Sequence, residues 1–178
     1  AITAESLSID QQILMEKILD SMAHRGPDAS GIFSDSNVVL GHRRLSILAL
    51  SSLANQPMFS DDGRFALILN GEIYNFIELK EILIGFGYTF RTQSDTEVLL
   101  YSLIHWGKNA LDRLNGMFSF ILWNRDTKEL FGARDRFGVK PLYYALHKKH
   151  YYFSSELGPL FRAGVPKRKS EKIWANFL

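Results

Sequence analysis

Apolar side chains near the start of the chain recur at the spacing of a helix. Ser8 followed by Gln11 fits a capping box, and the apolar residues that follow are Ile9, Ile13, Leu14, Ile18, Leu19 and Met22. The pattern predicts a helix that ends before residues 24–28, because Gly26 and Pro27 both terminate helices.

The hydrophobic pattern then changes to short apolar runs separated by turn residues. Runs at 31–33, 38–40 and 65–69 are interrupted by polar residues at 35–37 and 61–63, which predicts strands. The runs are almost continuously apolar, so we expect both faces of the sheet to be covered.

Two more helices and a second group of strands complete the pattern. Asn75 is placed to cap a helix over 76–86, and Ser94 with Glu97 forms a second capping box before a helix that ends at Gly107. Later apolar runs predict strands at 117–123, 129–133, 142–146 and 151–154, followed by a helix from Ser155 onward. Because helices and strands come in blocks, the fold class is α+β with mainly antiparallel sheets.

Composition narrows the class of protein. The 178 residues are 46% hydrophobic and 22% charged, with a net charge of +2, which is typical of one globular domain. No apolar run reaches the ~20 residues of a membrane span, no signal peptide opens the chain, and the basic residues are dispersed. We therefore expect a cytoplasmic protein without a membrane or nucleic-acid partner.

The sequence contains no cysteine, which excludes disulfides, thiolate metal sites and a cysteine nucleophile within these residues. His24 and His42 lack a partner at metal-ligand spacing, so we interpret both as structural and expect no metal site. No serine has a G-x-S-x-G context and no nucleotide-binding glycine loop is present.

Asn70 and Gly71 follow a predicted strand and allow two interpretations. An amide side chain beside a glycine N–H supplies the two donors of an oxyanion hole. Asn-Gly is equally typical of a simple turn.

Arg44 and Asp95 are the second candidate pair. Asp95 lies at a capped helix start, where a carboxylate stabilises the helix dipole, and Arg44 can be an ordinary surface cation. Together they would also suit a free amino acid, with the guanidinium on its carboxylate and the carboxylate on its ammonium.

Seven motifs in a fixed order carry a family resemblance. They are His24-Arg25-Gly26-Pro27-Asp28, His42-Arg43-Arg44-Leu45-Ser46-Ile47, Asn55-Gln56-Pro57-Met58, Asn70-Gly71-Glu72-Ile73-Tyr74-Asn75, Ser94-Asp95-Thr96-Glu97, Leu114-Asn115-Gly116-Met117-Phe118 and Arg134-Asp135-Arg136-Phe137-Gly138-Val139-Lys140-Pro141-Leu142-Tyr143. From His24 to about Val165 the chain resembles the glutaminase domain of class II glutamine amidotransferases of the asparagine synthetase type.

The resemblance implies a fold and a reaction. The fold is that of N-terminal-nucleophile hydrolases, a four-layer αββα sandwich of mainly antiparallel sheets. The reaction is hydrolysis of the glutamine side-chain amide, with the ammonia passed to a C-terminal synthetase domain that uses ATP and Mg. No cofactor is implied for the glutaminase domain itself, and a homodimer is compatible with the family. Aspartate is the default ammonia acceptor, and related chains modify other carboxylates or sugars.

Site roles also follow from the motif positions. Arg44 would hold the glutamine carboxylate and Asp95 its ammonium, while Asn70 and the Gly71 N–H would form the oxyanion hole. The pocket would be lined by Glu72 and by the segment Leu45, Ser46 and Ile47. We expect these side chains to face one pocket.

The start of the chain departs from the family pattern. The nucleophile of the family is an N-terminal cysteine that opens the first strand as Cys-Gly-Ile, and here residue 1 is Ala1. We interpret residues 1–3 as the tail of a truncated first strand, so the domain would span 1–165, and 166–178 would be a linker and the start of the synthetase domain. Without its neighbour, the strand at 65–70 would then show unpaired backbone groups along one edge. The alternative is a non-catalytic domain of the same fold that serves as a structural module.

Overall fold

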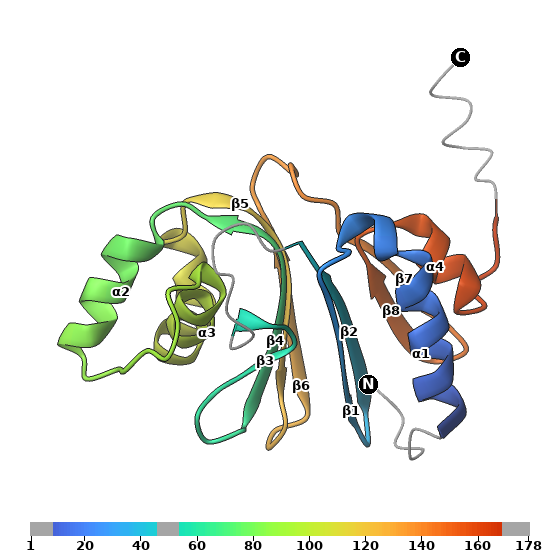
Figure 1. Cartoon of the computed structure of the whole chain (residues 1–178), viewed down its shortest axis with the longest axis horizontal. Coiled ribbons are helices and arrows are strands. Elements are labelled where there is room, and N and C mark those ends of the chain that lie inside the picture. The colour runs from blue at the N-terminus through green and yellow to red at the C-terminus, as the bar shows by residue number, and fades with distance from the viewer. Residues whose placement is uncertain (1–8, 46–53, 169–178) are drawn as a thin grey trace.

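The computed structural model describes residues 9–45 and 54–168 (Figure 1). In chain order the elements are α1 (Ile9–Ser21), the 3₁₀ helix η1 (Ala23–Arg25), β1 (Ala29–Asp35), β2 (Val38–Arg44), β3 (Met58–Phe59), β4 (Phe65–Ile73), α2 (Phe76–Gly85), α3 (Asp95–Trp106), the 3₁₀ helix η3 (Gly107–Asp112), β5 (Gly116–Asn124), β6 (Glu129–Arg134), β7 (Tyr143–His147), β8 (His150–Ser154) and α4 (Leu157–Arg162). The predicted helices and strands are present, and β3 is an additional short strand.

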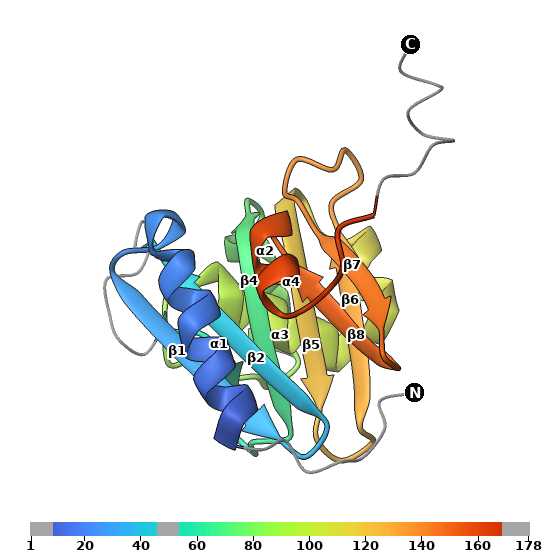
Figure 2. The same ribbon diagram turned by 90° about the vertical axis from the view of Figure 1, so that its right-hand side faces the viewer.

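These elements form four layers (Figures 1 and 2). Helices α2 and α3 cover one face of a four-stranded sheet with the order β3-β4-β5-β6. The hairpins β1-β2 and β7-β8 lie on its other face and are covered in turn by α1 and α4. Every strand pairing is antiparallel, so the predicted αββα arrangement with antiparallel sheets is confirmed. No helix in the described part of the chain is long and apolar enough to cross a membrane.

The central strands are apolar on both faces because both faces are buried. On β5, Phe118, Phe120 and Leu122 pack toward α2 and α3, while Ile121 and Trp123 belong to a second core with β2. Successive side chains of a strand point to opposite faces, which explains the uninterrupted apolar run in the sequence.

Two of the predicted helix caps are wrong in detail. Asn75 precedes α2, but its Nδ2 donates to Arg113 O at 2.9 Å and its Oδ1 accepts from Asn115 N at 2.9 Å, which ties the helix start to the loop before β5. Ser94 does cap α3, through the N–H of Thr96.

The acidic member of the second capping box, Glu97, does not bond back to Ser94. Its buried carboxylate instead accepts hydrogen bonds from the N–H groups of Arg91 and Thr92 at 2.9 and 2.7 Å, so it stabilises the loop before the helix. A buried carboxylate needs such donors, and tertiary burial decided which donors it found. The capping box at Ser8 lies outside the described residues.

Candidate functional site

The edge of β4 that faces away from β5 organises the site. Strand β3 pairs only with Ala66 and Leu67, and beyond that point side chains take over the edge. Gln56 Oε1 accepts from Leu69 N at 2.5 Å, and Asp95 Oδ2 accepts from Ile73 N at 2.9 Å. The expectation of unpaired backbone groups along the strand at 65–70 is therefore wrong at Leu69.

The N–H of Gly71 lies between those two bonded positions on the same edge. Alternate residues of an antiparallel strand direct their N–H groups to the same side, so Gly71 shares the orientation of Leu69 and Ile73. The residue has φ +142°, and a Cβ here would lie 2.0 Å from Met117 O. Glycine is required because β5 approaches too closely for any side chain.

Asn70 continues β4 and is paired with Ser119 of β5, so the alternative reading of Asn70-Gly71 as a turn is wrong. Its side-chain nitrogen Nδ2 is buried and has no hydrogen-bond partner in the part of the chain that the structure describes. A buried donor without a partner is costly, unless its function is to meet a group that enters the pocket. The amide of Asn70 and the N–H of Gly71 are thus donors of neighbouring residues within one strand.

Arg44 is the last residue of β2 and is buried, with 9% of its surface exposed. Its Nη1 donates to Asn55 Oδ1 at 2.7 Å, which orients the guanidinium. Its backbone carbonyl accepts from Asp28 N at 3.1 Å, which joins the polar motif at 24–28 to the end of β2. Arg44 is therefore not a surface cation.

Asp95 is the first residue of α3 and is also buried, at 6% exposure. Burial raises the pKa of the Asp95 carboxyl above its ordinary value, and the nearby charge of Glu72 acts in the same direction. Hydrogen bonds from Ile73 and Thr96 partly oppose this rise. A cation beside Asp95 would stabilise its charged form.

The predicted residues converge on one polar cavity of about 370 Å³. Six of the eight line it, namely Arg44, Leu45, Asn70, Gly71, Glu72 and Asp95. The other two, Ser46 and Ile47, lie outside the described residues. Cationic and anionic side chains are both present, which suits a zwitterion.

Several further residues of the cavity were not assigned a role from the sequence. They include His24, Arg25, Gln56, Thr96 and Lys140. Lys140 belongs to the long motif after β6, where Asp135 accepts from the N–H groups of Val139 and Lys140 at 2.8 and 2.9 Å. Nε2 of His24 lies 3.0 Å from Oε1 of Glu156, the residue immediately before α4. Their motifs were recognisable, but only the fold brings these segments to one pocket.

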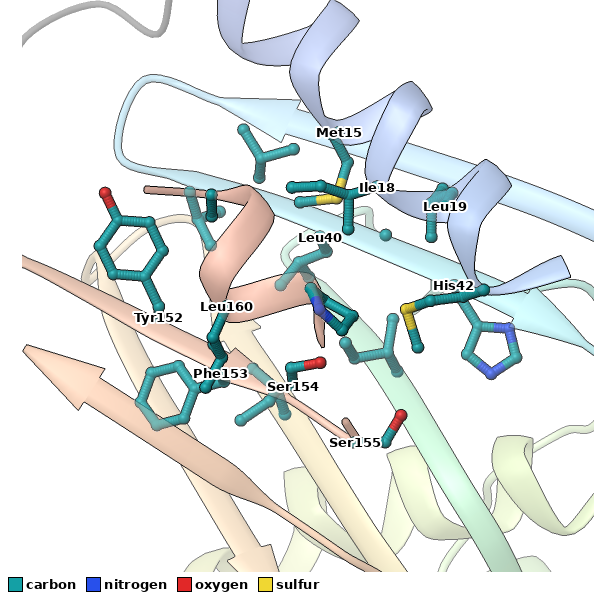
Figure 3. A pocket seen from close by; sticks show the side chains of 18 of the residues that line it. Met15, Ile18, Leu19, Leu40, His42, Tyr152, Phe153, Ser154, Ser155 and Leu160 are labelled. Atoms are coloured by element: carbon teal, nitrogen blue, oxygen red, sulfur yellow. The ribbon is translucent and has the colours of Figure 1, made fainter. Parts of the chain in front are cut away.

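A second cavity, also of about 370 Å³, lies between the sheet layers (Figure 3). It is mainly apolar, with Met15, Ile18 and Leu19 of α1 on one side and Tyr152 and Phe153 of β8 on another. His42 and Asn70 line both this apolar cavity and the polar cavity. Arg25, Arg43 and Leu69 also line both, so the two spaces share five lining residues.

Comparisons with known proteins show the family of this chain. Residues 2–178 match the family described as the glutamine amidotransferase domain. The glutamine-hydrolysing asparagine synthetase 1 of Bacillus subtilis is 48% identical over 147 residues, which is 83% of this chain and 23% of that protein. The amidase chry2 of Gibberella zeae is 39% identical over 153 residues, covering 85% of this chain and 23% of that protein.

Solved structures show the same fold. The glutamine phosphoribosylpyrophosphate amidotransferase of B. subtilis superimposes with a TM-score of 0.72 at 26% identity, over 85% of this chain and 41% of that one. Its likeness confirms the predicted N-terminal-nucleophile hydrolase fold. The chain spans about a quarter of the length of the curated relatives it matches. With the match over almost every residue, the chain belongs to the glutamine amidotransferase domain family.

Proposed function

We propose that the polar cavity binds L-glutamine and that this domain serves to hydrolyse the side-chain amide. The observation that carries the proposal is the convergence of Arg44, Asn70, Gly71 and Asp95 on one cavity. Arg44 then pairs with the α-carboxylate of glutamine and Asp95 with its α-ammonium. The amide of Asn70 and the N–H of Gly71 face the side-chain carbonyl.

This assignment uses the groups as the fold presents them. A buried guanidinium held by Asn55 is a preorganised donor for a carboxylate, and it cannot lose its charge. A buried carboxylate with a raised pKa gains stabilisation when an ammonium binds beside it. The unpartnered Nδ2 of Asn70 gains an acceptor in the same event.

The chemistry is acyl transfer. A nucleophile attacks the side-chain carbonyl carbon of glutamine, and the oxygen becomes an oxyanion that the Asn70 and Gly71 donors stabilise. The C–N bond then breaks, the nitrogen leaves as ammonia after it gains a proton, and water releases glutamate from the acyl intermediate. The family resemblance assigns the nucleophile to an N-terminal cysteine, whose own α-amine accepts the thiol proton. The 178 residues contain no cysteine.

We further propose that the ammonia is used by a synthetase domain of the same protein that consumes ATP and Mg. The supporting observation is that relatives named as glutamine-hydrolysing asparagine synthetases match this chain over only about a quarter of their length. Because those relatives are named asparagine synthetases, we propose aspartate as the acceptor of the ammonia.

The test measures the binding of glutamine to the chain and to Arg44 variants by chemical-shift titration. We expect Arg44→Ala to weaken binding by about 2–4 kcal/mol, because the substrate carboxylate loses its buried charged partner. Arg44→Lys restores part of the loss, since it keeps the charge without the planar fork. Arg136→Ala, which removes an exposed cation outside the cavity, should bind glutamine like the unaltered chain.

Two glutamine analogues sharpen this test. One analogue lacks the α-carboxylate and the other lacks the α-amine. Arg44→Ala should weaken binding of the analogue that keeps the carboxylate, and it should leave binding of the analogue without a carboxylate unchanged. Equal losses for both analogues would show that Arg44 maintains the fold and does not bind the carboxylate. The proposal would then be wrong.

A further inference from the structure

His42 joins the β1-β2 hairpin to the four-stranded sheet through a hydrogen bond with β4. It lies on β2, two residues before Arg44, and its Nε2 is 3.1 Å from Leu69 O on β4. A carbonyl oxygen can only accept, so Nε2 carries the proton. The other nitrogen, Nδ1, is buried and has no partner among the described residues.

The ring of His42 is neutral under ordinary conditions. Burial, with a smaller contribution from the charge of Arg44, lowers the pKa of His42 to about 4, although the hydrogen bond with Leu69 acts in the opposite direction. A neutral imidazole has one donor and one acceptor nitrogen. The contact with Leu69 therefore fixes one tautomer, with the proton on Nε2.

Leu69 lies on the edge of β4 that faces away from β5. Its backbone groups bond to side chains there, and not to a neighbouring strand. Strand β3 ends its pairing at Leu67. The N–H of Leu69 then donates to Gln56 Oε1, and its carbonyl accepts from His42. These two bonds clamp β4 immediately before the proposed oxyanion hole.

The carbonyl of Leu69 and the N–H of Asn70 belong to one planar peptide unit. Fixing the direction of that carbonyl consequently fixes the plane that contains the Asn70 Cα, from which the Asn70 side chain projects, and the Gly71 N–H belongs to the next peptide unit of the same strand. Asn70 also lines both cavities together with His42, so the two residues share one wall.

We infer that His42 is a positioning residue: its Nε2–H holds the Leu69 carbonyl and thereby directs the Asn70 and Gly71 donors toward the glutamine side-chain carbonyl. The inference rests on the proposed function and adds a role that the motif positions did not assign. His42 touches neither the α-carboxylate nor the α-ammonium in this scheme. Its effect is confined to the carbonyl end of the ligand.

Three variants distinguish the effect of the Nε2–H donor of His42 from the effect of the volume of its ring. His42→Gln places an amide nitrogen near the position of Nε2, whereas His42→Asn places one near Nδ1, and His42→Leu removes both ring nitrogens. His147→Leu is the matched control, because His147 lies on β7 and lines neither cavity. Each variant is made in the 178-residue chain with ¹⁵N labelling.

The first readout is spectroscopic and independent of ligand. At pH 7 the His42 ring nitrogens should show the neutral tautomer protonated at Nε2. The Gly71 backbone amide and the Asn70 side-chain amide should shift in His42→Leu and His42→Asn, and return toward their original positions in His42→Gln. His147→Leu should leave them unchanged.

The second readout compares L-glutamine with L-norvaline, which keeps both α-groups but has no side-chain carbonyl. His42→Leu should weaken glutamine binding about 2- to 12-fold, the effect of one neutral hydrogen bond, and leave norvaline binding unchanged. His42→Gln should restore glutamine binding.

Three results would overturn the inference: a His42 ring that is charged or protonated at Nδ1 at pH 7, unchanged Asn70 and Gly71 resonances in His42→Leu, or equal loss of both ligands. If the unaltered chain bound neither ligand, the proposed function would fail, while the tautomer and the amide resonances would still decide whether His42 positions these donors.

Discussion

Leu69, Gly71 and Ile73 show how three N–H groups on one strand edge acquire different roles. Two are bonded to Gln56 and Asp95, and the middle one belongs to Gly71, which lines the polar cavity. The bonded neighbours hold the strand still, so the Gly71 donor is preorganised, which is the condition for effective stabilisation of an oxyanion. Asp95 both accepts from the N–H of Ile73 and lines the polar cavity.

The raised pKa of Asp95 predicts a pH dependence of glutamine binding. The ammonium of glutamine binds the charged carboxylate, so affinity should be highest above the raised pKa and fall as the pH drops through it. Binding in that range should also release a proton, which calorimetry in buffers of different ionisation enthalpy detects.

Asp95→Asn provides the control for this dependence. It retains an acceptor for the Ile73 N–H but has no charge to titrate, so its binding should be weaker and nearly constant over the same range. A wild-type affinity that did not change with pH would contradict the role of Asp95 as the partner of the ammonium.

At the scale of elements, contacts at the tip of the β1-β2 hairpin hold the hairpin against the four-stranded sheet. Asp35 at the end of β1 accepts from Trp123 Nε1 on β5 at 3.2 Å and lies 3.3 Å from Lys128 Nζ. Burial acts to raise the pKa of Asp35, but hydrogen bonds from Trp123, Ser36 and Lys128 outweigh it and lower the pKa to about 2. The side chain is 12% exposed, so solvent screens these contacts little.

Asp35 should therefore stabilise the fold most at neutral pH. Its folded-state pKa lies below the ordinary value of 3.8, so the contribution of about 2 kcal/mol is complete above pH 4 and disappears as the pH falls toward 2. Urea unfolding should show Asp35→Asn to be less stable than the unaltered chain at pH 7, with a difference that shrinks at pH 3.

Asp112→Asn is the matched control for Asp35. Asp112 also faces a cation, Arg136 at 3.5 Å, but its side chain is 86% exposed. Exposed ion pairs contribute little, so this variant should change the free energy of unfolding by less than about 0.5 kcal/mol. Similar losses for both variants would mean that the inter-sheet contact is not what makes Asp35 stabilising.

At the scale of the whole molecule, four layers bring distant segments to one cavity. Arg44 comes from the hairpin layer, Asn70 and Gly71 from the central sheet, and Asp95 from the covering helices. Lys140 comes from the loop after β6. Under the proposed function, binding of glutamine and attack on it are separable, because the proposed binding groups are among these residues and no cysteine is.

We accordingly predict that the 178-residue chain binds glutamine but does not hydrolyse it at a useful rate. An oxyanion hole without a nucleophile leaves only a modest residual rate. A version of the chain extended to begin with Cys-Gly-Ile should release ammonia, and the same version with Ser in place of that Cys should not. Comparable ammonia release by the unextended chain would show that another residue attacks.

The sequence alone determined the elements and the fold class, and it indicated eight site residues, six of which line the polar cavity. Local rules suffice for this, because helix period, strand runs and turn residues are set by neighbours in the chain. Ordered motifs then indicated Arg44, Asn70, Gly71 and Asp95 together.

Only the tertiary structure decided which interactions those residues make. The partner of a buried polar group depends on which segments the fold brings near it. Thus Glu97 bonds to the loop before its helix and not to its capping box, and Gly71 is required by the close approach of β5 and not by a turn. For the same reason, no pattern in the sequence could show that His42 donates to Leu69, 27 positions away on the facing sheet.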